Sequence, residues 1–154
     1  MTFCPRHFKV VSGIGKSQYP LVAFDNALLN AGIGDYNLVK VSSILPADCE
    51  YTEKISLDNG SILYAAYSTL TVKESEIGTT SVAVAIPSNE KDNGVIFECS
   101  LSDTKNDLEN IAREMCIEAM ENRGRRISKV LSASKEVIGE PHFFISSISA
   151  VVMW

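Results

Sequence analysis

The chain has 154 residues, of which 45% are hydrophobic and 21% charged, a balance typical of a folded globular protein and not of a disordered one. This length suits one domain, residues 1–154, with enough chain to bury a core. The formal net charge of −5 argues against nucleic acid as a partner, because phosphate binding needs concentrated lysine and arginine.

The first third of the chain predicts a strand, a helix and a second strand. Residues 8–11 form an apolar strand pattern, and residues 12–15, Ser-Gly-Ile-Gly, predict a turn with positive φ that closes it. Residues 20–31 predict a short helix with one apolar face, and Gly32 is placed to cap its C-terminus. Residues 37–45 predict one continuous strand, which ends before a proline.

The remainder predicts further strands and one long helix. Asp107 and Thr104 form a candidate capping box in a helix over residues 103–123, which Gly124 would end. Turn residues at 58–60 and 91–94 separate neighbouring strands, and short turns favour antiparallel pairing. We therefore expect an α+β fold, a sandwich of mainly antiparallel sheets flanked by helices. The strands are predicted at residues 62–72, 81–86, 95–99, 127–134 and 143–153.

The cysteines and the apolar stretches indicate a location for the protein. None of Cys4, Cys49, Cys99 and Cys116 forms a CxxC pair, and the chain has two histidines, so the sequence predicts no metal site. The start of the sequence shows no basic head followed by an apolar run, and no stretch is long enough to span a bilayer. We expect a cytoplasmic protein with reduced thiols and no membrane partner.

Two adjacent serines interrupt the apolar strand predicted at residues 37–45. Ser42 and Ser43 lie between Val41 and Ile44, and the two-residue period of a strand would send their hydroxyls to opposite faces. On composition alone, a structural role is favoured, with the hydroxyls hydrogen-bonded to the backbone. Conventional catalytic motifs such as GxSxG, HExxH and GxGxxG are absent from the sequence.

Segments spread through most of the chain carry a family pattern. Residues 24–34 read Phe-Asp-Asn-Ala-Leu-Leu-Asn-Ala-Gly-Ile-Gly, residues 37–39 read Asn-Leu-Val, and residues 42–46 read Ser-Ser-Ile-Leu-Pro. Further matches are Ala66-Tyr67, residues 82–87 and residues 94–98, Gly-Val-Ile-Phe-Glu. In this order they resemble the pyruvoyl-dependent arginine decarboxylases, whose fold is an αββα sandwich. One departure is the stretch 63–68, Leu-Tyr-Ala-Ala-Tyr-Ser, where the family usually has a proline and a glycine around the Ala-Tyr pair.

The resemblance implies that the chain makes its own cofactor by cutting itself between Ser42 and Ser43, into chains 1–42 and 43–154. The Ser43 hydroxyl would attack the Ser42 carbonyl and convert the amide into an ester. β-Elimination and hydrolysis would then leave a covalent pyruvoyl group at residue 43 and release ammonia. Asn37 matches a family position in the active site, where its amide could stabilise the oxyanion during processing. Alternatively, Asn37 is a turn residue that starts a strand.

The resemblance also implies decarboxylation of arginine to agmatine through a Schiff base between the substrate amine and the pyruvoyl ketone. Glu98 matches the proton donor, and apolar neighbours would raise its pKa and keep it protonated. The alternative for Glu98 is a place on the wet face of a strand. Asp25 matches the residue that binds the substrate guanidinium, because one carboxylate can accept two parallel donors. The implied assembly is a trimer of two-chain protomers with active sites at their boundaries.

Two rival functions remain open from the sequence. The first keeps the chemistry but changes the amino acid to ornithine, lysine or histidine, because the departure at residues 63–68 alters the expected pocket. The second is a non-catalytic scaffold subunit that never cleaves, which the intact Ser42-Ser43 step disfavours.

Overall fold

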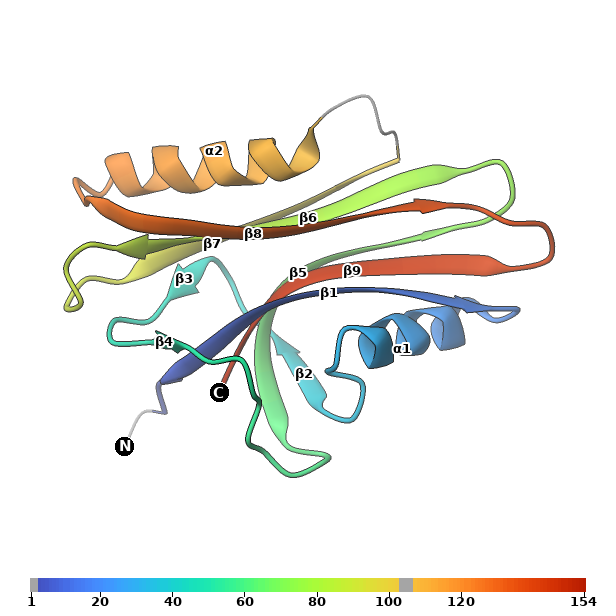
Figure 1. The fold of residues 1–154 in the computed structure, drawn as a ribbon, viewed down its shortest axis with the longest axis horizontal. Coiled ribbons are helices and arrows are strands. Elements are labelled where there is room, and N and C mark those ends of the chain that lie inside the picture. The colour runs from blue at the N-terminus through green and yellow to red at the C-terminus, as the bar shows by residue number, and fades with distance from the viewer. Residues whose placement is uncertain (1–2, 103–106) are drawn as a thin grey trace.

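A computed structural model describes residues 3–102 and 107–154 of the chain, which form two helices and nine strands (Figure 1). In chain order these are β1 (His7–Ser17), α1 (Pro20–Asn30), β2 (Asn37–Lys40), β3 (Ile44–Leu45), β4 (Glu50–Tyr51), β5 (Ile62–Val72), β6 (Ile77–Pro87), β7 (Gly94–Leu101), α2 (Leu108–Glu121), β8 (Ile127–Ile138) and β9 (Phe144–Met153).

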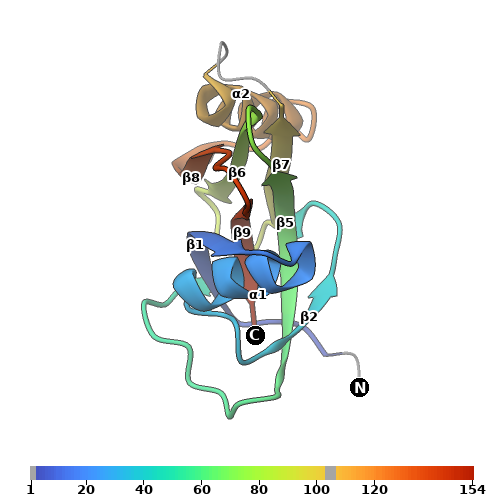
Figure 2. The same ribbon diagram turned by 90° about the vertical axis from the view of Figure 1, so that its right-hand side faces the viewer.

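The strands make two sheets that are stacked between the helices. The five-stranded sheet has the order β2-β5-β9-β1-β4, and the four-stranded sheet has the order β3-β7-β6-β8. Most neighbours are antiparallel, while β1–β4 and β2–β5 pair in parallel. Figures 1 and 2 show α2 on the outer face of the four-stranded sheet and α1 against the five-stranded sheet. The predicted α+β sandwich flanked by helices is confirmed.

Each interface between layers has its own apolar core. Ile33 and Ile148 are buried between α1 and the five-stranded sheet, Phe8 and Ile96 are buried between the sheets, and Met120 is buried under α2. The central strands therefore bury both faces, which explains why β6 and β9 read as nearly continuous buried runs.

Two glycines in β1 allow α1 to lie directly on the strand. The predicted turn at residues 12–15 is wrong, because β1 continues through Ser17 and neither Gly13 nor Gly15 has a positive φ. A Cβ on Gly15 would lie 2.2 Å from both the Ala23 carbonyl oxygen and the Ala27 nitrogen of α1. Glycine is needed here for close approach between backbones and not for its conformational freedom.

The strand predicted over residues 37–45 is in fact two strands in different sheets. β2 ends at Lys40 on the edge of the five-stranded sheet, and β3 begins at Ile44 on the edge of the four-stranded sheet. Residues 41–43 carry the chain from one sheet to the other. The apolar pattern persists across this step because β2 and β3 each contribute to a core, so the sequence shows no break.

Helix ends agree with the predicted glycine caps. Gly32 has a φ of 78°, and the Ile33 N–H donates to the Leu28 carbonyl oxygen at 3.0 Å, which closes α1. Gly124 likewise has a φ of 63° after α2. Asp107 caps the start of α2 by accepting from the Asn110 N–H at 3.1 Å.

Some boundaries were not predictable or cannot be compared. The helix predicted from residue 103 is observed from Leu108, and Thr104 of the predicted capping box lies outside the described residues. The short strand β4 was not predicted. No helix within residues 3–102 and 107–154 has the length and apolar character that a membrane span requires.

Candidate active site

The two adjacent serines lie where the chain leaves one sheet and enters the other. The Val41 N–H donates to the Ala65 carbonyl oxygen of β5 at 3.0 Å, and the Ile96 N–H of β7 donates to the Ser43 carbonyl oxygen at 2.8 Å. Ser42 is exposed and Ser43 is half-buried. The peptide bond between Ser42 and Ser43 is therefore flanked by an anchored residue on each side, while it lies outside both strands.

A cavity of about 320 Å³ opens beside this step. Ser42 and Tyr64 line it from the connection and from β5, and the Phe3 ring closes one side by stacking on the Tyr64 ring with centroids 5.4 Å apart. The complete lining is Phe3, Pro5, Val41, Ser42, Ile44, Pro46, Tyr64 and Met153. Tyr64 belongs to the stretch that departs from the family pattern, so this departure lies at the cavity next to the serines.

Glu98 lies on the same strand that holds Ser43. The pairing Ile44↔Val95 in β3–β7, continued by one residue, places Ser43 opposite Ile96, and Glu98 is two residues further along β7. Residues two apart share a face, and Ile96 is buried between the two sheets, so Glu98 projects into the same interface near its edge. The structure thus brings Ser42, Ser43 and Glu98 to one edge of the sandwich.

Burial raises the pKa of the Glu98 carboxyl above its usual range, because a half-buried carboxylate loses solvation. Two weaker effects oppose this shift, namely the positive charge of Lys40 and a hydrogen bond from the backbone of Glu98 itself. The net effect keeps the carboxyl protonated to a higher pH than that of an exposed glutamate. A protonated carboxyl at this position can donate a proton to a group in the adjoining space.

Lys40 is a site neighbour that sequence reasoning missed. Its ammonium lies 4.8 Å from the centroid of the Tyr67 ring, which is a cation–π distance, and its charge lowers the pKa of Glu98. The sequence contained one signal for it, because Lys40 is the charged residue within the otherwise apolar or polar stretch 37–45. Because this charged residue lies in the strand that leads into the two serines, Lys40 was a reasonable candidate for a site residue.

The single chain does not bring Asn37 and Asp25 to the serines. Asn37 begins β2, and its side-chain amide donates to the Gly60 carbonyl oxygen at 2.8 Å. Asp25 is exposed on α1, the helix that covers the face of the five-stranded sheet away from β7. Glu98 and Ser43 are therefore in one layer of the molecule, whereas Asp25 is in another.

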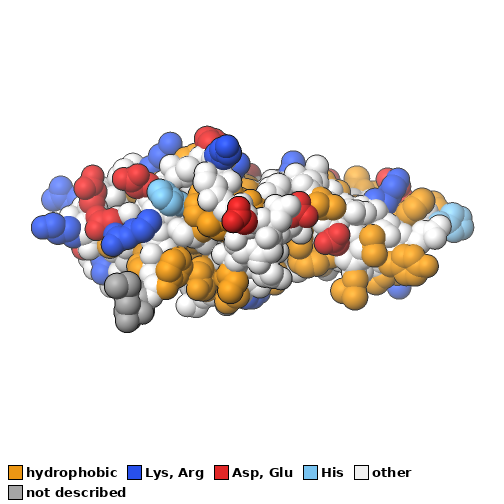
Figure 3. Space-filling view, turned by 90° about the horizontal axis from the view of Figure 1, so that it is seen from below, with side chains coloured by type: hydrophobic (Ala, Val, Ile, Leu, Met, Phe, Trp, Pro, Cys, Tyr) orange, Lys and Arg blue, Asp and Glu red, His pale blue; other side chains and the backbone are white. Residues whose placement is uncertain are grey.

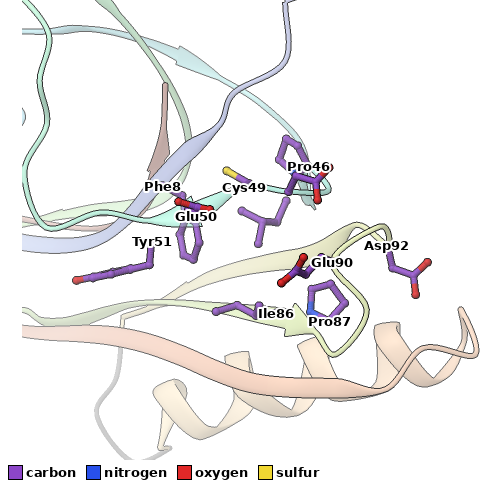
Figure 4. A pocket seen from close by; sticks show the side chains of 11 residues that line it. Phe8, Pro46, Cys49, Glu50, Tyr51, Ile86, Pro87, Glu90 and Asp92 are labelled. Atoms are coloured by element: carbon purple, nitrogen blue, oxygen red, sulfur yellow. The ribbon is translucent and has the colours of Figure 1, made fainter.

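A second cavity, of about 310 Å³, lies on the other side of β3 (Figure 4). Leu45 and Phe8 form part of its apolar floor, while Glu50 and Glu90 are among the carboxylates at its rim. Ile44 faces the first cavity and Leu45 faces the second, as the alternation of a strand requires. The two cavities thus flank the residues that immediately follow Ser43.

The residues at the step between β2 and β3 suit a pyruvoyl group at position 43. Ser43 carries the hydroxyl from which such a group would form, the exposed Ser42 leaves the peptide bond accessible, and the neighbouring cavity offers room for a small substrate. The half-buried Glu98, whose carboxyl pKa is raised, lies at the same edge.

Comparison with known proteins identifies the family. The family model described as pyruvoyl-dependent arginine decarboxylase matches residues 7–153. The pyruvoyl-dependent arginine decarboxylase of Methanococcus aeolicus is 36% identical over 151 residues, which cover 97% of this chain and 90% of the relative. That of Thermococcus kodakarensis is 38% identical over 138 residues, 87% of this chain and 85% of the relative. That of Methanopyrus kandleri is 31% identical over 150 residues, 97% of each chain.

The fold, the serine step and these matches define a carboxy-lyase of the pyruvoyl-dependent class. The chain belongs to the pyruvoyl-dependent arginine decarboxylase family, as the family model spans nearly the whole sequence.

Proposed function

We propose that this chain cuts itself between Ser42 and Ser43 and then converts arginine to agmatine and carbon dioxide. The observation that carries the proposal is the family match over residues 7–153, combined with a Ser42-Ser43 step in which Ser42 is exposed and the Ser43 carbonyl accepts from the Ile96 N–H. The relatives are named arginine decarboxylases, and this name is the basis for the substrate.

The cut requires a hydroxyl at residue 43 and a carbonyl at residue 42. The Ser43 Oγ attacks the Ser42 carbonyl carbon, and the acyl group moves from nitrogen to oxygen. Elimination of the ester then frees residues 1–42 with a carboxylate, and hydrolysis of the resulting dehydroalanine leaves the pyruvoyl carbonyl at residue 43 and releases ammonia. Ser42 contributes its backbone alone, so its own hydroxyl is not needed for the cut.

The cut chains are expected to remain together, because strands of one piece pair with strands of the other in the five-stranded sheet. β1, from chain 1–42, pairs with β9 along Phe8↔Met153 to Ser17↔Phe144, and β2 pairs with β5. Both β9 and β5 belong to chain 43–154. Separating the pieces would break these ladders and expose the core under α1, so cleavage leaves the fold intact.

In turnover, the pyruvoyl group supplies a carbonyl that accepts the electrons released when carbon dioxide leaves. Glu98 is the proposed proton donor to the substrate α-carbon, because its raised pKa holds a proton and it lies on the strand that binds the Ser43 carbonyl. Asn37 is proposed, from the family resemblance, to stabilise the oxyanion of the cut; since its amide binds the Gly60 carbonyl oxygen away from Ser43 of its own chain, it would act from a neighbouring protomer. Asp25 is proposed to bind the guanidinium of arginine through two parallel hydrogen bonds.

An active site that uses Asp25 needs a second copy of the chain, since Asp25 and Ser43 lie in different layers of one protomer. We propose a trimer of two-chain protomers, acting in the cytoplasm. Exposed apolar side chains support an interface around α1, where the relative exposure is 82% for Leu21, 45% for Val22 and 50% for Leu29. Figure 3 shows hydrophobic side chains gathered on the lower face of the molecule as it is oriented in Figure 1.

The cut is tested by the intact mass of the denatured protein. We expect two species, residues 1–42 and a modified 43–154, in the parent protein and one full-length species in Ser43→Ala. Ser42→Ala is the matched control and should still be cut, because it keeps the attacking hydroxyl. A parent protein that stays full length on warming would favour the non-catalytic scaffold, and fragments from Ser43→Ala would refute the nucleophile.

The substrate is tested by release of carbon dioxide from carboxyl-labelled amino acids. We expect the highest kcat/KM for arginine, with ornithine, lysine and histidine well below it. A preference for one of the other three would keep the chemistry but overturn the substrate.

The shared active site is tested by complementation. Asp25→Asn and Glu98→Gln should each be poorly active alone. When the two are unfolded, mixed in equal amounts and reassembled, random pairing should restore about a quarter of the parent sites. Activity no higher than that of either variant would show that each site lies within one protomer.

A further inference from the structure

The N-terminal segment lies against the loop that follows the serine step. β1 and β4 pair in parallel, with His7 opposite Glu50, and the Glu50 N–H donates to the Arg6 carbonyl oxygen at 2.8 Å. The Arg6 guanidinium lies 3.9 Å from the Asp48 carboxylate. Phe3 is stacked on Tyr64, so the segment is held at both of its ends.

This pairing brings two cysteines to the same place. Continuing the β1–β4 register back by one residue sets Arg6 opposite Cys49, and Cys4 lies two residues before Arg6, on the same side of an extended chain. In Figure 4 the Cys49 sulfur is drawn beside β1, and the charge of the neighbouring Glu50 also raises the pKa of its thiol. Cys4 is exposed and Cys49 is half-buried.

The electrostatics of Cys49 are consistent with a nearby Cys4. Burial raises the pKa of the Cys49 thiol to about 12, and the charge of a Cys4 thiolate adds to the increase. Such an effect decays with distance, which agrees with the placement of Cys4 and Cys49 on one side of the β1–β4 pair. Residues 3–6 precede β1 and belong to no strand, which lets the Cys4 backbone adjust to the geometry that a disulfide requires.

We propose that Cys4 and Cys49 form a reversible disulfide when the protein meets an oxidant. Given the proposed cut at Ser42-Ser43, on which this consequence rests, Cys4 belongs to chain 1–42 and Cys49 to chain 43–154. The disulfide joins the two chains covalently. It also fixes Phe3 and Pro5, which flank Cys4, on the cavity beside Ser42.

A small-molecule disulfide such as oxidised glutathione is the co-reactant that balances the reaction. The exposed Cys4 thiolate attacks it, forming a mixed disulfide and releasing one glutathione thiolate. The Cys49 thiolate then attacks the Cys4 sulfur and releases the second. Two protein thiols lose two electrons and two protons, and one oxidised glutathione becomes two reduced molecules. The raised pKa of Cys49 makes the second step faster as the pH increases.

The experiment uses the parent protein and Ser43→Ala, each equilibrated with oxidised glutathione, quenched with iodoacetamide and measured as denatured intact mass without reductant. For the cut parent we expect one species that contains both chains and that dithiothreitol separates. For uncut Ser43→Ala we expect a full-length species that carries two fewer carbamidomethyl groups than the reduced and alkylated protein, with Cys4 and Cys49 peptides joined after trypsin digestion. Cys4→Ser and Cys49→Ser should each abolish the link, and Cys99→Ser, the matched control, should keep it.

The two arms separate this inference from the proposed function. Separately modified Cys4 and Cys49 in Ser43→Ala, or a bond from either one to Cys99 or Cys116, overturns the disulfide regardless of cleavage. If Cys4 and Cys49 are joined in Ser43→Ala but the parent protein is never cut, the disulfide is supported and the proposed function is overturned. In that case there are no separate chains for the disulfide to link.

Discussion

Leu45 is expected to hold the new chain end that cleavage creates. It is two residues after Ser43, its relative exposure is 1%, and it packs in the core between the sheets with Phe8 and Ile96. Ile44, its neighbour in β3, has a relative exposure of 42% and points the other way. Comparing Leu45→Ala with Ile44→Ala therefore tests whether an effect comes from lost packing in the core or only from a change close to the cut.

The expected loss follows from burial. Leu45→Ala removes a fully buried side chain from a packed interface, which costs about 3 kcal/mol of unfolding free energy. Ile44→Ala removes a half-exposed side chain and should cost less than about 1 kcal/mol. With a urea dependence of about 2 kcal/mol per molar, the Leu45 variant should unfold at about 1.5 M less urea.

Unfolding is best measured in the Ser43→Ala background, where the chain is a single piece. Cleavage of the same variants is followed by intact mass in the parent background, and we expect Leu45→Ala to be cut more slowly because β3 no longer fixes Ser43. Equal urea midpoints for Leu45→Ala and Ile44→Ala would refute the anchoring role. A destabilised Leu45→Ala that is cut at the parent rate would show that cleavage does not depend on β3.

Three other substitutions test the site and the packing. Lys40→Gln removes a charge that lowers the pKa of Glu98, so the fall in kcat with rising pH should move to higher pH. Lys40→Arg should leave this fall unmoved, and a shift in Lys40→Arg or none in Lys40→Gln would contradict the coupling. Asp25→Asn should be cut normally but raise the KM for arginine at least about tenfold, and an unchanged KM would remove Asp25 from substrate binding. Gly15→Ala should lower the free energy of unfolding in urea by about 2–3 kcal/mol, because its Cβ meets the backbone of α1. Gly32→Ala strains a positive φ in open space and should lower this free energy by about 1 kcal/mol. Equal losses in the two variants would argue against the close approach.

The sequence predicted those elements whose ends carry local signals. β5 was predicted with both of its observed ends, because Asp58-Asn59-Gly60 turns the chain just before it and charged residues follow Val72. Gly32 and Gly124 likewise marked the helix ends through the positive φ that each adopts. In these cases the determining interaction lies within a few residues of the signal.

The misplaced boundaries depend on interactions between distant residues. Gly15 could equally serve a turn or a close approach, and the deciding atoms belong to α1. β4 is only Glu50–Tyr51 and forms because β1 offers a free edge. No periodicity within two residues could reveal such a strand.

The candidate site was predictable in part. Ser43 and Glu98 were identified by resemblance, and the β3–β7 pairing brings them to the same edge. Tyr64 was included only within the stretch 63–68 and Lys40 was not identified, because their nearness to the serines depends on the pairing of β2 with β5 and on the approach of the two sheets. A local sequence pattern can indicate which residue types are suited to the chemistry, but which residues lie next to the serines is determined by tertiary contacts.

The division of the predicted strand into β2 and β3 is what makes a self-cleaving step compatible with a stable fold. A residue inside a ladder has its carbonyl and N–H engaged by neighbouring strands, and attack on its carbonyl would have to break that pairing first. Ser42 instead lies between two ladders, with Val41 bound to β5 and Ser43 bound to β7. The bond that is proposed to break thus carries little of the structure, while both ends it would create are already attached to different sheets. Accessibility for chemistry and retention of the two pieces therefore have the same origin, the crossing of residues 41–43 from one sheet to the other.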